Sequence, residues 1–111
     1  MFNQKKILLV DDEKSILEML EILLVSEGYI VFKAINGEEG VTLAKKHKPD
    51  VIILDVKMPK MSGYMVASIL GEDPDLSHIP ILLLTAVAQM AGNITIEQPT
   101  DYRLIKPFKP E

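Results

Sequence analysis

The chain has 111 residues, of which 48% are hydrophobic and 25% are charged, as in one ordinary globular domain. The formal net charge of −4 argues against a general affinity for nucleic acid, and the absence of cysteine excludes disulfides, thiolate catalysis and thiolate-based zinc sites. No hydrophobic run is long enough for a signal peptide or a membrane span, so we expect a cytoplasmic protein with no direct contact to nucleic acid or membrane.

Four short hydrophobic runs predict strands. Three of them lack hydrophobic–polar alternation, which is typical of strands buried on both faces of a parallel sheet. The runs are Ile7–Val10, Tyr29–Phe32, Val51–Leu54 and Ile81–Leu84.

The segments between these predicted strands have the hydrophobic periodicity of helices. The first helix carries a hydrophobic stripe and precedes Gly28, which suits a left-handed position after a helix. The second should run from about residue 38 to 47 with Asn36 or Gly37 near its start, and the third from about 64 to 70, where Gly71 and Pro74 should end it. The stripe of the first helix consists of Ile16, Leu17, Leu20, Leu23 and Leu24.

A fifth candidate strand lies near Tyr102–Ile105, whereas little regular structure is expected between Ala88 and Thr100. Pro99 forbids a helix through the end of that stretch. The alternation of strands and helices indicates an α/β domain, with a parallel sheet and helices on both of its faces.

Polar residues follow four of the predicted strands. Acidic residues end the first and third strands, a hydroxyl ends the fourth, and a lysine ends the fifth. Since ligands of open parallel sheets bind at the carboxyl ends of the strands, these groups are expected to converge on one edge. They are Asp11, Asp12, Asp55, Thr85 and Lys106.

The convergence of these groups suits phosphoryl transfer. Three neighbouring carboxylates repel one another and need a cation, and Mg²⁺ prefers oxygen ligands. Asp11 and Asp12 would hold the ion, and Asp55 would contribute one oxygen to it and attack phosphorus with the other. Lys106 and Thr85 would then neutralise the remaining phosphoryl oxygens.

Each group also has a simpler interpretation when it is taken singly. Asp11 and Asp12 could cap the first helix, Asp55 could be a loop residue, Thr85 an ordinary strand end, and Lys106 a surface lysine. Only the four strand ends taken together favour a phosphorylation site. The methionines are expected to be core filler or loop surface.

Four ordered motifs resemble those of response-regulator receiver domains: Leu8–Glu13, Asp55–Gly63, Thr85-Ala86 and Lys106–Phe108. The resemblance implies a single domain over residues 1–111, with a flavodoxin-like, doubly wound, five-stranded parallel sheet of order 2-1-3-4-5. It implies phosphorylation by a histidine kinase or phosphotransfer protein.

Residue by residue, the resemblance implies that Asp55 is the phosphoacceptor. The Mg²⁺ ligands would be Asp11, Asp12, Asp55 and the main-chain carbonyl of Lys57. Thr85 would be the switch hydroxyl that relays the change to the segment after the fourth strand, and Lys106 would bind phosphate beside a cis bond to Pro107. Such a domain is a signalling switch and not an enzyme, because it catalyses only its own phosphorylation and dephosphorylation.

Two departures from the family pattern are visible. The chain stops at Glu111 without the family's fifth helix, so it is either a natural short form or cut from a longer protein. In the first case we expect a partner domain or a second copy to cover that face of the sheet. The fourth helix is degenerate, and Arg103 stands where the family usually has an aromatic residue, with Tyr102 displaced by one position.

Two other functions remain open. These departures favour a phosphate-independent interaction module as the alternative to a phosphorylated switch. A hydrolase working through an aspartyl phosphate is disfavoured, because Lys57 stands where a second acid–base carboxylate is usual.

Overall fold

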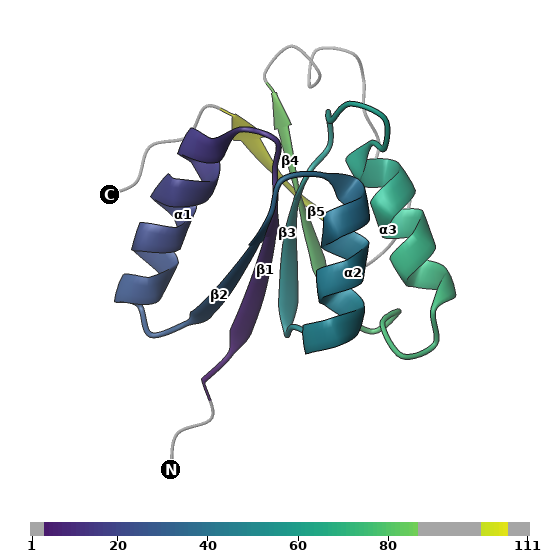
Figure 1. The fold of residues 1–111 in the computed structure, drawn as a ribbon, viewed down its shortest axis with the longest axis horizontal. Helices are drawn as coiled ribbons and strands as arrows, with labels where there is room; N and C mark the ends of the chain where they lie inside the picture. The colour runs from purple at the N-terminus through teal and green to yellow at the C-terminus, as the bar shows by residue number, and fades with distance from the viewer. Residues whose placement is uncertain (1–3, 87–100, 107–111) are drawn as a thin grey trace.

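The computed structural model describes residues 4–86 and 101–106, with side chains up to Leu84 (Figure 1). Its sheet has the order β2-β1-β3-β4-β5, and every neighbouring pair is parallel. The strands are β1 (Lys6–Val10), β2 (Ile30–Ala34), β3 (Val51–Asp55), β4 (Ile81–Ala86) and β5 (Asp101–Lys106). The helices are α1 (Lys14–Ser26), α2 (Gly37–His47) and α3 (Gly63–Glu72).

The α/β class and the predicted order of the first four strands are confirmed. β5 is described by its backbone, which pairs with β4 from Ile81–Asp101 to Ala86–Lys106. The expected degenerate fourth helix and the end of the chain after Lys106 lie outside the described residues. Among the described helices, none is long and apolar enough to cross a membrane.

Helices cover both faces of the sheet, with α1 on one face and α2 and α3 on the other (Figure 1). Each face of the sheet has its own hydrophobic core, and successive residues of β1 point into the two cores in turn. Leu8 and Val10 pack on the side of α2 and α3, while Ile7 and Leu9 pack on the side of α1. This explains why the strand has no hydrophobic–polar alternation in its sequence.

The end of α1 is closed by Gly28, as predicted, with φ +96°. Its N–H donates to the Val25 carbonyl at 3.0 Å, and the N–H of Tyr29 reaches back to the Leu24 carbonyl at 3.1 Å. This is the hydrogen-bond pair of a Schellman motif. Because Tyr29 is held by the helix, β2 begins at Ile30, one residue later than the sequence predicted.

Asn36 is the N-cap of α2, in agreement with the prediction that it lies near the start of this helix. Its side chain accepts a hydrogen bond from the Glu39 N–H at 2.8 Å, and the Glu39 carboxylate accepts one from the Ile35 N–H at 3.0 Å. This reciprocal arrangement is close to a capping box. It ties the start of the helix to the end of β2.

The predicted end of α3 at Gly71 was wrong. The helix continues through Gly71 to Glu72, and Asp73 is extended before Pro74. A glycine inside a helix costs only about 1 kcal/mol relative to alanine. Burial of Leu70, Ala67 and Val66 outweighs that cost, whereas the proline ring forbids helical backbone at the residue before it.

Candidate functional site

The carboxyl ends of β1 and β3 lie side by side, since Val10 pairs with Leu54 in the sheet register. Asp11 and Asp12 follow β1 directly, and Asp55 is the last residue of β3. One carboxylate oxygen from each of Asp11, Asp12 and Asp55 lies within 4.8 Å of the other two. The predicted convergence of these three acidic side chains is therefore a feature of the structure.

The three carboxylates differ in exposure. Asp11 is 1% exposed and Asp55 is 4% exposed, whereas Asp12 lies at the surface. Two buried carboxylates beside a third are electrostatically costly, since they repel one another in a medium less polar than water. The exposed carboxylate leaves the cluster open to ions from solvent.

Asp11 is oriented by local hydrogen bonds. Its N–H donates to the Ala34 carbonyl at 3.0 Å, which continues the pairing of β1 with β2 by one residue. Its side chain accepts a hydrogen bond from the Glu13 N–H at 2.9 Å. The N-cap of α1 is Glu13, so neither Asp11 nor Asp12 occupies the capping position that a simpler interpretation offered.

Asp55 belongs to β3 and is not a loop residue. The pairing with β4 continues beyond it, because the Val56 N–H donates to the Leu84 carbonyl at 2.9 Å. Its position is fixed from the other side by Gly63, whose N–H donates to the Val56 carbonyl at 2.7 Å. A Cβ atom on Gly63 would lie 2.8 Å from the Val56 Cα and would overlap the Asp55 carbonyl oxygen.

The loop from Val56 to Ser62 connects Asp55 to α3. Met58 is anchored in the core with 7% exposure, while Lys57, Pro59 and Lys60 are exposed. At the loop tip, the Met61 N–H donates to the Pro59 carbonyl at 2.7 Å and Lys60 has φ +68°. The loop therefore makes a tight turn of the γ type, which is uncommon for a residue other than glycine.

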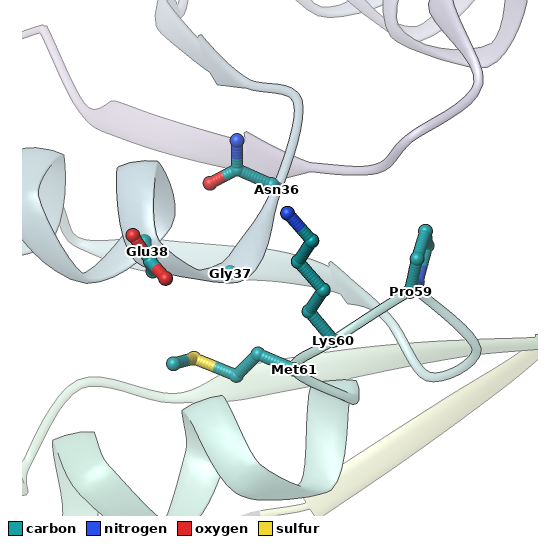
Figure 2. Close-up of a pocket in the computed structure, with 6 residues that line it drawn as sticks. All are labelled: Asn36, Gly37, Glu38, Pro59, Lys60 and Met61. Carbon is teal, nitrogen blue, oxygen red and sulfur yellow. The ribbon is translucent and has the colours of Figure 1, made fainter.

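A pocket of about 270 Å³ lies between this loop tip and the start of α2. Figure 2 shows that the Lys60 amine extends from the loop toward Asn36, and that the Met61 side chain extends alongside Gly37. No pattern in the sequence predicted this pocket. Its lining residues are Asn36, Gly37, Glu38, Pro59, Lys60 and Met61.

Thr85 and Lys106 lie on strands that end at the same edge as Asp55. Asp55 pairs with Leu84, so Thr85 stands one residue further along β4. In the next pairing of the sheet, Thr85 is opposite Ile105 and Ala86 is opposite Lys106. The backbone thus brings both residues to the predicted edge, while their side chains lie outside the described part of the chain.

The donor set of the acidic cluster suits a hard cation. It consists of carboxylate oxygens alone, two of them on buried side chains with fixed backbone, and Mg²⁺ prefers such ligands and retains several waters. A bound divalent cation would offset the mutual repulsion of the three carboxylates.

Comparison with known proteins identifies a family. The protein-family model described as "Response regulator receiver domain" matches residues 7–111 of this chain. The "Probable transcriptional regulator ycf27" of Cyanophora paradoxa is 44% identical over 110 residues, which make up 98% of this chain and 45% of that protein. The chain therefore spans less than half the length of this relative.

Solved structures are similar as well. Chemotaxis protein CheY4 of Vibrio cholerae is 32% identical with a TM-score of 0.80, over 96% of this chain and 90% of that chain. The receiver domain of a sensor histidine kinase from Pseudomonas aeruginosa PAO1 is 28% identical with a TM-score of 0.80, over 96% of this chain and 88% of that one. That structure is described as having a magnesium ion coordinated in the active site cleft.

Proposed function

The chain belongs to the family of response regulator receiver domains, and from this membership we propose that it is a signalling switch phosphorylated on Asp55. A receiver domain is a signalling module and not a conventional enzyme. The observation that carries the proposal is the cluster of Asp11, Asp12 and Asp55, whose carboxylate oxygens lie within 4.8 Å of one another at the carboxyl edge of the sheet.

Each residue of the cluster has a proposed role. Asp11, Asp12 and Asp55, together with the main-chain carbonyl of Lys57, would hold Mg²⁺. When bound, the ion would neutralise negative charge on the phosphoryl group and on the carboxylates. Asp55 would use a carboxylate oxygen to form the new bond to phosphorus, while the bond from phosphorus to the donor breaks and the donor keeps that electron pair.

We assign the remaining phosphoryl oxygens to Thr85 and Lys106. The Thr85 hydroxyl would donate a hydrogen bond to one oxygen, and the Lys106 ammonium would pair with another. The backbone register supports this assignment, because it places Thr85 one residue beyond the partner of Asp55 and Lys106 beside Ala86. Movement of Thr85 toward the phosphoryl group would relay the change to the segment after β4.

The proposed phosphodonor is a histidine kinase or a phosphotransfer protein, which is the general partner of receiver domains. For this domain we propose the family's sheet order 2-1-3-4-5, which the parallel backbone pairing of β5 with β4 supports. Two relatives more than twice as long as this chain carry the name "Probable transcriptional regulator", so control of transcription is the output we propose.

The test is the intact mass of the protein after incubation with a small acyl phosphate and Mg²⁺. We expect one phosphoryl adduct on the wild type, no adduct on Asp55→Asn, and loss of labelling when EDTA removes the metal. Folded wild-type protein that never acquires the adduct would contradict the proposal. It would favour instead an interaction module that works without phosphate.

A further inference from the structure

The loop that carries Lys57 has an unfavourable backbone at its tip. Lys60 has φ +68°, and such a sparsely populated backbone conformation costs a residue other than glycine roughly 1–3 kcal/mol. Such a conformation persists only where the surrounding structure imposes it. Lys60 and Pro59 are both exposed, so neither side chain packs the tip in place.

Met58 anchors one side of the tip in the core, and the contact that can hold the other side is made by Met61. Its side chain is partly buried and packs against the core cluster beneath α2 and α3. It lies so close to Gly37, the first residue of α2, that a Cβ atom there would be 2.9 Å from both Cγ and Sδ of Met61. Gly37 therefore admits the methionine, and Figure 2 shows the two side by side.

The first turn of α2 can hold Met61 in place because α2 itself is packed tightly against the sheet. A Cβ atom on Gly40 would lie 2.9 Å from a Val10 methyl group, so α2 rests directly on the end of β1. Val10 is followed by Asp11 of the acidic cluster. The same helix thus contacts the strand that precedes Asp11 and the loop that connects Asp55 to α3.

We propose that Met61 is a positioning residue for the metal site, acting through its contact with Gly37. The contact holds the loop from Val56 to Ser62 in a fixed position relative to the end of β1. It thereby fixes the position of the Lys57 carbonyl relative to Asp11 and Asp55. This inference rests on the proposed function, because it concerns how the Mg²⁺ ligands assigned there are held in place.

A Mg²⁺ titration followed by amide NMR tests the proposal. Truncation in Met61→Ala should weaken Mg²⁺ binding by about fivefold or more, the lower end of typical coupling between sites. Met61→Leu keeps the volume of the side chain and should bind Mg²⁺ nearly as well as the wild type. Met65→Ala is the matched control, because Met65 lies on the neighbouring helix and is 50% exposed.

Gly37→Ala tests the same contact from the other side and remains informative if Met61→Ala does not fold. Alanine is the better helix former, so a purely helical role of Gly37 predicts unchanged Mg²⁺ affinity. The positioning role predicts weaker Mg²⁺ binding, since the new methyl group would lie 2.9 Å from both Met61 and the buried Val66, and the flexible methionine is the side chain that can move away. By reciprocity, Mg²⁺ should shift the amide signals of Gly37 and Glu38 in the wild type.

The outcomes separate this inference from the proposed function. Wild-type affinity for Mg²⁺ in folded Met61→Ala or Gly37→Ala would overturn the positioning role alone. Absence of any Mg²⁺ response in the wild type would overturn both the assigned metal site and the role of Met61. Weakened binding in Met61→Ala with recovery in Met61→Leu supports the inference.

Discussion

Gly63 leaves no room for a side chain behind Asp55. A Cβ atom would lie 2.8 Å from the Val56 Cα and 2.9 Å from the Asp55 carbonyl carbon, and backbone atoms at these distances cannot rotate away as a flexible side chain could. Gly63→Ala should therefore lower the free energy of unfolding by about 1–3 kcal/mol, the usual cost of overpacking. Urea unfolding measures this change.

Gly71 provides the matched control for that substitution. It lies in the same helix, α3, and a Cβ atom there would meet nothing within 4 Å. Gly71→Ala should raise the free energy of unfolding by up to about 1 kcal/mol, because alanine is the better helix former. Equal effects of the two substitutions would contradict the steric account of Gly63.

Asp12 carries the exposed carboxylate of the acidic cluster, so it can be changed without disturbing the core. Without a metal ion, Asp12→Asn removes one of three repelling charges and should raise the thermal midpoint of unfolding. The midpoint is measured in EDTA at low ionic strength, where repulsion is least screened. Glu38→Gln, an exposed acidic residue outside the cluster, is the control, and an equal gain there would assign the effect to net charge alone.

At the scale of the elements, α2 depends on Asn36 for its first turn. The side chain satisfies the Glu39 N–H at 2.8 Å, and Asn36→Ala should cost about 1 kcal/mol of stability. Asn36→Gly should cost only a few tenths of a kcal/mol, because glycine is tolerated at the N-cap. Thermal unfolding of the two variants compares them, and identical losses would indicate that Asn36 acts through something other than the cap.

Most strands and helices were predictable because each strand follows from a short hydrophobic run and each helix from a local periodicity. The convergence of Asp11, Asp12 and Asp55 was predictable too, since parallel strands bring their carboxyl ends to one edge. The errors came from competition between local signals and packing. Burial of Leu70 carried α3 past Gly71, and a helix-closing hydrogen bond kept Tyr29 out of β2.

The contact of Met61 with Gly37 could not be predicted in this way. The two residues lie 24 positions apart (61 − 37) and belong to no shared periodic pattern. A methionine in a loop is compatible with many surroundings, because its side chain is flexible and adapts to irregular gaps. Only the packing of α2 against the loop determines which gap it fills.

For the whole molecule, folding and metal binding should be linked. The folded chain brings three carboxylates within 4.8 Å, whereas in an unfolded chain Asp55 is separated from Asp11 and Asp12 by more than forty residues of flexible chain. Mg²⁺ should therefore bind the folded state and raise the free energy of unfolding by about 1.4 kcal/mol at ten times its dissociation constant. Each further tenfold increase in concentration should add about 1.4 kcal/mol.

Urea unfolding at a series of Mg²⁺ concentrations measures this slope, with NaCl added to keep the ionic strength constant. Asp55→Asn removes a buried carboxylate from the cluster and should flatten the dependence on Mg²⁺. The same slope in the wild type and in Asp55→Asn would mean that the ion stabilises the chain elsewhere. A slope that disappears with Asp55 ties the stability of the whole domain to the edge of the sheet at which we place phosphorylation.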